Sequence, residues 1–245
     1  MKKQLQLSLV SAAVLLAATT VCSAGSYKGE NYKGEAPCPT PLMIKDGWYL
    51  GAQLGGDSYR VNHNASVINA TGSLTASPVI NPTGVVGGLF GGYGQYFSDI
   101  YYLGGELFAN ASNASSKYSV ATTASGSAFP ASYYAKVSIQ GSYGFGLLPG
   151  LKLNDASLLY LRLGYNRVSI KGQETATIGG VSSSNSKTNW SSGFNLGLGL
   201  ETAFYQNWSL RAEASHTNYS SFYSGATKII PYDNQAMLGL IYHFA

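Results

Sequence analysis

The chain has 245 residues and a formal net charge of +4, and only 11% of its residues are charged, against the roughly 25% usual in soluble domains. Glycine and tyrosine are abundant, with 30 and 19 residues, and no stretch after residue 25 approaches the ~18 apolar residues of a membrane helix. These properties favour a sheet with an apolar outer face over a helical membrane protein. The small charge, without a basic cluster, argues against a nucleic-acid partner.

The first 24 residues have the pattern of a signal peptide. Lys2 and Lys3 precede an apolar stretch that ends near Thr20, and Cys22-Ser23-Ala24 supplies the small residues of a cleavage site after Ala24. Cleavage would remove Cys22 and leave Cys38 without a disulfide partner. Residues 25–45 repeat Tyr-Lys-Gly-Glu and are rich in proline, which predicts a flexible periplasmic lead-in. A retained anchor helix or a lipid-modified Cys22 fits the pattern less well.

From residue 46 to residue 245 the hydrophobic pattern has a period of two, which predicts a single β domain. Eight segments show it, each near the ~9–11 residues that a tilted strand needs to cross a bilayer. In the fourth segment the pattern assigns Val137, Ile139 and Tyr143 to one face and Lys136 to the other. The apolar faces run over 48–54, 85–97, 101–109, 137–147, 159–165, 194–200, 208–214 and 238–244.

The connections between these segments alternate in length. Ser98-Asp99, 153–156 and 205–207 have the composition of tight turns, whereas 62–82, 115–131, 172–187 and 222–233 are longer and rich in Ser, Thr, Gly and Asn. Short periplasmic turns and long outer loops are typical of bacterial outer-membrane barrels. The sequence therefore predicts an all-β, eight-stranded antiparallel up-and-down transmembrane β-barrel with both ends of the barrel chain on the periplasmic side.

The few charges within the segments decide which face meets lipid. Each lies opposite the apolar face of its own strand, whereas a soluble lipocalin-like barrel would carry many charges outside. Three acids and three bases can neutralise one another in a narrow interior, where an unpaired charge would cost several kcal/mol. We therefore predict a lumen charge network of Glu106, Lys136, Arg162, Glu201, Arg211 and Glu213. Arg167 and Lys171 break this pattern and are expected above the membrane.

The aromatic residues fall into two groups along the predicted strands. We expect a periplasmic girdle that includes Trp48, Trp208 and Phe244, and an outer girdle of Tyr59, Tyr118, Tyr133, Tyr134, Tyr165, Trp190, Tyr219 and Tyr232. Two girdles of amphipathic rings are typical of a barrel in a bilayer.

Several motifs resemble the small outer-membrane barrel family, which includes OmpA-like transmembrane domains and opacity-type surface proteins. They are the segment 47–55 (GWYLGAQLG), 103–106 (LGGE), 163–165 (LGY) and the closing 238–244 (LGLIYHF). The resemblance implies a Gram-negative outer-membrane location, delivery by periplasmic chaperones, and insertion by the barrel assembly machinery, which reads the last strand. The assembly signal would comprise Leu238, Leu240, Tyr242 and Phe244. Ala245 departs from the family pattern, which usually ends on the aromatic residue.

The candidates for catalysis and metal binding are few. His216 lies where lipid A deacylase barrels carry a His-x-Ser pair, but the matching position here is Asn218, and Ser220 would lie about 13 Å away along a strand. His63 and His243 belong to no cluster with metal-ligand spacing. We therefore expect neither an enzyme nor a cofactor.

The long outer connections are the remaining functional candidates, because loops on a rigid scaffold are the usual place for recognition. The leading prediction is a structural and surface-interaction barrel with an adhesin-like role, whose outer loops contact host, matrix or lipopolysaccharide. The alternatives are a small passive, porin-like channel and, less favoured, a lipid-A-modifying enzyme.

Overall fold

The computed structural model describes residues 42–69, 72–76, 79–123, 130–178, 181–224 and 227–244, and every regular element within these ranges is a β-strand. No helix among these residues is long and apolar enough to cross a membrane. The proposed signal peptide and most of the lead-in lie outside the described residues. The strands are β1 (Gly47–Asn69), β2 (Gly72–Ala76), β3 (Val79–Ile80), β4 (Thr83–Phe97), β5 (Tyr101–Ser112), β6 (Ser115–Thr123), β7 (Pro130–Asn154), β8 (Ser157–Ile178), β9 (Val181–Tyr205), β10 (Trp208–Tyr219), β11 (Phe222–Ser224) and β12 (Thr227–His243).

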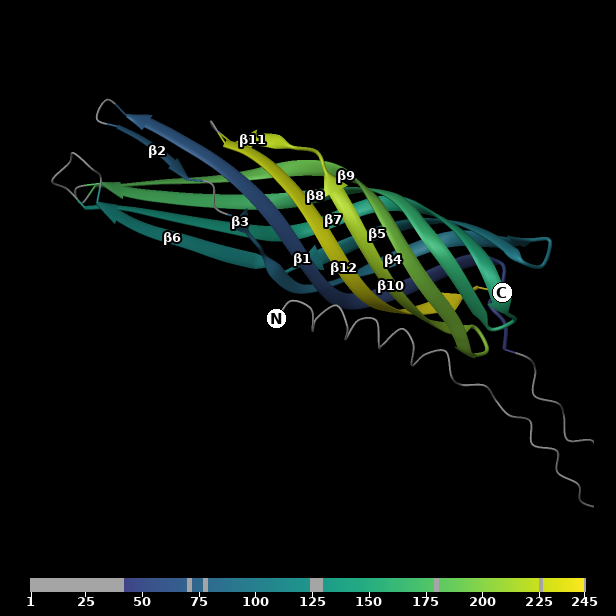
Figure 1. Cartoon of the computed structure of the whole chain (residues 1–245). Helices are drawn as coiled ribbons and strands as arrows, with labels where there is room; N and C mark the ends of the chain where they lie inside the picture. Colours follow the sequence, from purple (N-terminus) through teal and green to yellow (C-terminus); the bar gives the residue numbers. More distant parts are fainter. Residues whose placement is uncertain are drawn as a thin grey trace, which may run out of the picture.

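Eight long strands form a closed antiparallel ring (Figure 1). Around the ring their order is β1, β4, β5, β7, β8, β9, β10 and β12, and β12 pairs with β1 to complete the circle. The short strands pair with the projecting parts of this ring: β2 and β3 with β1, β6 with β4 and β7, and β11 with β12. The predicted eight-stranded up-and-down barrel is confirmed.

Burial alternates along the strands as the sequence pattern requires. In β5 exposed and buried residues follow one another from Tyr101 to Ala111 without interruption. On β1, Trp48 and Leu50 are 67% and 54% exposed, whereas Tyr49 between them is 3% exposed. Large apolar side chains thus cover the outside of the barrel, as in a barrel in lipid, and the buried charged side chains of the strands that form the ring face inward together with glycines and packed aromatic and apolar residues.

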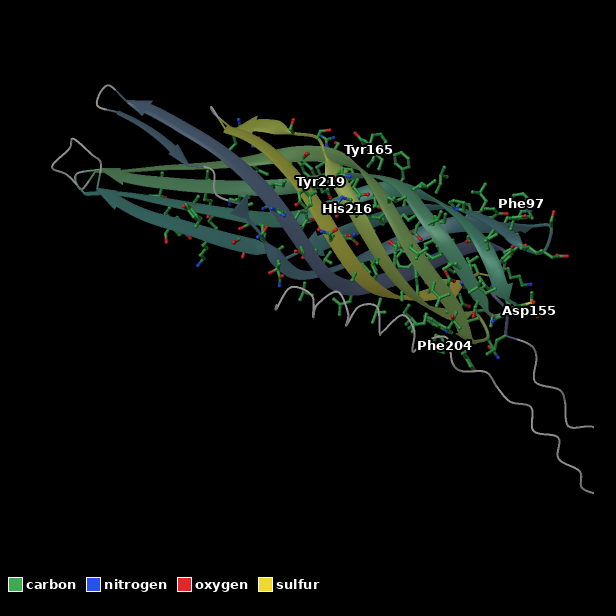
Figure 2. The ribbon with its side chains drawn as sticks, in the orientation of Figure 1. Phe97, Asp155, Tyr165, Phe204, His216 and Tyr219 are labelled. Atoms are coloured by element: carbon green, nitrogen blue, oxygen red, sulfur yellow. The ribbon has the colours of Figure 1, made fainter. Side chains whose placement is uncertain are left out.

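Tight turns close one end of the barrel, at the right of Figure 2, where Phe97, Asp155 and Phe204 are labelled. Ser98 and Asp99 have positive φ angles of 53° and 58°, a region that Asp tolerates better than most residues. The chain enters and leaves the barrel at this end, since the Phe244 N–H donates to the Trp48 carbonyl at 2.9 Å. The predicted positions of the short turns are confirmed, and both ends of the barrel chain lie at this same end.

The strands run much farther than predicted at the opposite end. β7, β8 and β9 have 25, 22 and 25 residues, and segment 172–187, predicted as a loop, is a β-hairpin that stays paired as far as Ile178 and Val181. Its Ser, Thr and Val side chains are compatible with a ladder even where no lipid surrounds it. With β6 and β7, this hairpin continues beyond the closed ring (Figure 1).

One irregularity reverses the faces of β7. Ile139 pairs with Ile170 and Gly141 with Ser169, so Gln140 is an extra residue in a β-bulge. Below the bulge Tyr143 faces out and is 47% exposed, but above it Val137 and Ile139 are buried inside. The prediction that all three share one face was wrong, because an extra residue interrupts the alternation.

Aromatic pairs mark two levels on the outer surface. Trp48 lies against Tyr93 at the turn end, with ring centroids 5.3 Å apart, and Tyr143 lies against Trp190 nearer the projecting strands, at 5.7 Å. Tyr165 joins the outer level through Phe194. These outward rings form the periplasmic and outer girdles.

Three tyrosines predicted for the outer girdle face the interior instead. Tyr118, the direct partner of the buried Ala135, packs partly buried against an interior apolar cluster. Tyr59 and Tyr219 are 1% and 5% exposed, and their rings stack 6.5 Å apart. Each falls on the inward face of its strand, together with Asp57 and Thr217 respectively. Figure 2 shows Tyr219 partway along the ribbon, near the level of Tyr165.

Candidate functional site

The barrel interior contains a network of ion pairs contributed by β5, β8, β9 and β10. The Arg162 guanidinium contacts Glu106, and its Nε lies 2.7 Å from Oε1 of Glu213. The Arg211 guanidinium also contacts Glu106, and its Nη2 lies 3.0 Å from Oε2 of Glu201. All five side chains are at most 7% exposed. Each buried charge therefore has an opposite charge in contact, which offsets the loss of hydration.

Four further side chains complete the network, and the charge pattern of the sequence does not identify them as members of it. The Tyr160 hydroxyl donates to Glu213 at 2.6 Å, and the Tyr49 hydroxyl to Glu106 at 3.2 Å. The Ser209 hydroxyl donates to Oε1 of Glu201 at 2.6 Å, and Nε2 of His243 lies 2.8 Å from the same oxygen. All four lie on the inward parity of their strands, which was the available signal.

Lys136 is not part of this network, contrary to the sequence prediction. It lies above the bulge in β7, where Val137 and Ile139 take the inward positions. Lys136 therefore shares the outward face with Tyr134 and Ser138. The bulge, which the alternation does not reveal, is the physical reason for this error.

Aromatic rings and glycines shape the space around the guanidinium groups. The Arg211 guanidinium lies over the rings of Phe90, Tyr160 and Tyr49, at 4.7, 5.1 and 5.5 Å from their centroids, and such stacking stabilises a desolvated cation. Gly199 lies opposite Tyr160, and a Cβ at Gly199 would come 2.2 Å from that ring. Glycine at this position lets the Tyr160 hydroxyl reach Glu213.

A small polar cavity of about 10 Å³, room for about one water molecule, adjoins the network. Its lining consists of Gln53, Phe108, Arg162, Asn166, Asn195, Glu213, Ser215, Gln235 and Met237. Asn166 and Asn195 both donate to the Thr217 hydroxyl oxygen, at 3.2 and 2.9 Å, and their side-chain oxygens have no protein partner. Polar groups of this kind are suited to hold ordered water.

Apolar clusters fill the interior on both sides of the polar layer. Toward the turn end the cluster consists of Ile44, Tyr49, Phe90, Tyr102, Phe108, Leu148, Leu158, Tyr160, Ala203 and Ile241. Toward the projecting strands it consists of Tyr59, Ala114, Val137, Ile139, Val168, Ile170 and Tyr219. Among the described residues the interior is thus packed in layers, as expected for eight strands.

Of the four residues predicted as an assembly signal, Leu238, Leu240 and Tyr242 lie on the outward face of β12, and Phe244 follows directly after the strand. Leu238, Leu240 and Phe244 are 61%, 42% and 51% exposed. The Tyr242 ring lies edge-on to Trp208, with centroids 5.1 Å apart, and also contacts Phe244. The end of the chain therefore presents a continuous apolar and aromatic face to lipid at the turn end.

His216, the residue tested for catalysis, lies on the outer face near the end of β10 (Figure 2). Its Nδ1 lies 2.8 Å from Oδ1 of Asn234, and its Nε2 lies 3.2 Å from Oδ1 of Asn218. Both ring nitrogens are thus occupied by amide groups, and neither contacts a nucleophile. Among the residues that the structure describes, no group of three or more His, Cys, Asp or Glu side chains is suited to hold a metal ion.

The family model of the outer membrane protein beta-barrel domain matches residues 14–244. No curated protein matches the chain. Among solved structures, the chain resembles Ail of Yersinia pestis, crystallised in complex with the heparin analogue sucrose octasulfate. The two are 15% identical over 79% of this chain and 99% of Ail, with a TM-score of 0.33.

Two other solved structures of outer membrane proteins are also similar. The outer membrane protease OmpT from Escherichia coli is 10% identical over 84% of this chain and 99% of that one, with a TM-score of 0.48. OprG from Pseudomonas aeruginosa is 14% identical over 82% of this chain and 99% of that one, with a TM-score of 0.43. At such identities these likenesses concern the fold alone.

Proposed function

Because the chain belongs to the family of outer membrane protein beta-barrel domains and is an integral protein of the bacterial outer membrane, we propose that it is a structural and surface-interaction barrel with an adhesin-like role. Its ligands would be host or matrix molecules and the surrounding lipopolysaccharide. The observation that carries this proposal is the projection of long paired strands beyond the outer girdle, above an interior that is filled. A protein built this way exposes a large, stiff surface outside the membrane.

The projecting hairpins support the proposal because they are ordered by backbone pairing. β8 and β9 remain paired from Asn166 and Gly193, near the outer girdle, to Ile178 and Val181 at the tip. A paired strand loses less conformational freedom on binding than a free loop, so the same contact surface gives a tighter complex. This architecture suits recognition better than it suits transport.

The outward face of β12 supports a second part of the proposal, which concerns assembly. Periplasmic chaperones would deliver the chain, and the barrel assembly machinery would read Leu238, Leu240, Tyr242 and Phe244. These residues share the outward face at the C-terminal end of the barrel, where β12 pairs with β1 to close the ring.

A passive channel is the second candidate, and the polar cavity beside the ion pairs favours it. Water in that cavity would need a path past both apolar clusters and the Arg162–Glu106–Arg211 contacts. The purified barrel in a planar bilayer is therefore expected to show no stable conductance of nanosiemens size. A long-lived open state of that size would replace the adhesin-like role with a channel.

A lipid-A-modifying enzyme is not favoured, because the ring nitrogens of His216 are hydrogen-bonded to the amide oxygens of Asn234 and Asn218 and not to a serine. The experiment is a comparison of lipid A from cells with and without the protein by mass spectrometry. We expect identical lipid A, and the appearance of a deacylated or acylated species would contradict the proposal.

The experiment that tests recognition shortens one hairpin. Gln173 and Ser186 are register partners, so an Asn-Gly turn joining them removes residues 174–185 and leaves the ladder below intact. Cells that carry the full barrel are expected to bind one or more immobilised matrix components or host cells, and cells with the shortened barrel to lose that binding. Equal binding by both, or no binding above that of cells without the barrel, would contradict the proposal.

The matched control replaces the turn at Gln206-Asn207, at the opposite end, by Asn-Gly. Heat-dependent gel mobility checks that all variants fold, since a folded barrel migrates differently once heat unfolds it. The control is expected to bind as the full barrel does.

A further inference from the structure

We propose that the outer face of β6, β7 and β8 binds the phosphate groups of outer-leaflet lipopolysaccharide through Lys117, Lys136, Arg167 and Lys171, here called the basic face. This deepens the lipopolysaccharide part of the proposed function, because it assigns a lipid site to the wall of the barrel and requires no ligand at the hairpin tips. It depends only on the outer-membrane location.

The β-bulge at Gln140 puts Lys136 on the outer surface of the barrel wall. An uninterrupted alternation would have placed Lys136 on the interior face with Ser142, which is buried. The extra residue instead turns Val137 and Ile139 inward. Lys136 therefore points away from the barrel, like Tyr134 and Ser138.

The pairing of the strands then brings three lysines together. Lys117 on β6 is the direct partner of Lys136 on β7, a position in which Cβ atoms are ~4.5–5.5 Å apart. Lys171 on β8 pairs with Ser138, so it is a diagonal neighbour of Lys136, at about 7–8 Å. Like charges directly opposite each other destabilise a sheet, and an anion bound between them would remove that repulsion.

Arg167 extends the basic face toward the membrane. It lies four residues before Lys171 on the same face of β8, about 13 Å lower, and its guanidinium is 5.5 Å from the Trp190 ring. Trp190 and Tyr143 belong to the outer girdle. The four cations therefore begin at the girdle and continue outward, which is where the phosphates of a lipid head group lie.

The described acidic side chains all lie away from the basic face. The described acidic side chains lie either inside the barrel (Asp57, Glu106, Glu201, Glu213 and Asp233) or at the turn end (Asp46, Asp99 and Asp155). Among described side chains, the outer face of β6–β8 beyond the girdle thus has four cations and no carboxylate. Its complement is an anion with several phosphate groups, held from the depth of the girdle outward.

The test uses purified barrel in phosphatidylcholine nanodiscs, titrated with diphosphorylated lipid A and read by native mass spectrometry. The variant Lys117→Gln/Lys136→Gln/Lys171→Gln is expected to bind lipid A at least about tenfold more weakly. The matched control Lys45→Gln/Lys152→Gln/Arg60→Gln removes the same charge elsewhere and is expected to bind within about twofold of the unaltered barrel. Equal losses in both variants would overturn the proposal.

Three further arms identify the source of the anion. Dephosphorylated lipid A is expected to bind weakly to every variant. Inorganic phosphate that competes as strongly as lipid A would contradict a lipid site. Heparin fragments that bind through the same lysines while lipid A does not would assign the face to a sulfated glycan and overturn the proposal.

Stability provides a readout that a structural role for the lysines would not give. In zwitterionic detergent the triple variant is expected to unfold at the same or a higher temperature, because the Lys117–Lys136 repulsion is gone. With lipid A added, the unaltered barrel is expected to gain stability and the triple variant to gain little. A triple variant that is less stable in detergent and responds fully to lipid A would contradict the proposal.

Discussion

Arg162 holds two carboxylates inside the barrel, Glu106 and Glu213, and its loss would leave Glu213 with only the Tyr160 hydroxyl. Removing one partner of a buried ion pair typically costs about 3–5 kcal/mol. We therefore expect Arg162→Met to lower the free energy of unfolding by that amount, measured by denaturant titration followed by gel mobility. Arg167→Met is the matched control on the same strand, because Arg167 is exposed, and we expect a loss of about 1 kcal/mol or less. Equal losses would show that the interior ion pairs contribute no special stability.

Asp233 offers a test by pH, because it lies above the apolar band: its outward neighbours Asn234 and Ser58 are polar, and the band ends at Leu54 and Ala236. Burial raises the pKa of the Asp233 carboxyl well above its ordinary value, and the nearby charge of Asp57 raises it further. The folded state therefore holds a proton that the unfolded state releases near pH 4.

Stability from this group is greatest below pH 4 and falls as the pH rises toward the raised value in the folded protein. Asp233→Asn removes that fall, so its unfolding midpoint should exceed that of the unaltered barrel by a growing margin between pH 4 and pH 8. Asp155→Asn, at an exposed turn, should show a nearly constant difference. A margin for Asp233→Asn that shrinks with pH would contradict the expected direction.

At the scale of the element, the bulge in β7 makes an unusual deletion tolerable. Gln140 has no register partner on β8, so deleting it joins Ile139 to Gly141 and leaves both on their present faces. We expect a change of about 1 kcal/mol or less in the free energy of unfolding. Deleting Ser169 from β8 instead makes Val168 and Ile170 neighbours, so the two cannot both stay buried inside.

The Ser169 deletion is expected to cost at least about 3 kcal/mol, since exposing a buried Ile or Val side chain and leaving a void are both unfavourable. Denaturant titrations of the two deletion variants provide the measurement. Similar losses of unfolding free energy from both deletions would mean that Gln140 has a structural role beyond accepting the hydrogen bond from the Ser169 hydroxyl.

The hydrophobic alternation predicts most of the strands and interior charges, but not every residue position within them. Strict alternation identified all eight ring strands and five interior charges, because each apolar face must meet lipid. It failed at Lys136, because Val137, Ile139 and Tyr143 look alike on either side of an unseen extra residue. It also missed the outer halves of β8 and β9, because Ser and Thr there resemble a loop. Tyr59 and Tyr219 were misplaced because a tyrosine suits both a girdle and a packed interior.

For the whole molecule, the proposed assembly signal can be separated from girdle stability. Tyr242→Ser/Phe244→Ser is expected to lower the fraction of chain assembled in the outer membrane several-fold, and to leave folding of the purified chain into detergent nearly unchanged. Trp48→Ser/Tyr93→Ser removes another aromatic pair of the same girdle and is expected to assemble better than the Tyr242/Phe244 variant. Equal assembly of the two variants would remove any special role of the last strand.

The seam between β1 and β12 has a consequence for biogenesis. Sixteen successive partners, from Tyr49–His243 to Asn64–Lys228, join the first and last strands of the ring, so nearly two hundred residues must be gathered before the circle can shut. Until then two strand margins remain open, and each is a template for pairing with other chains. The interval before closure is therefore the stage at which this polypeptide most needs a chaperone. Pairing of β1 with β12 then ends the exposure of both strands.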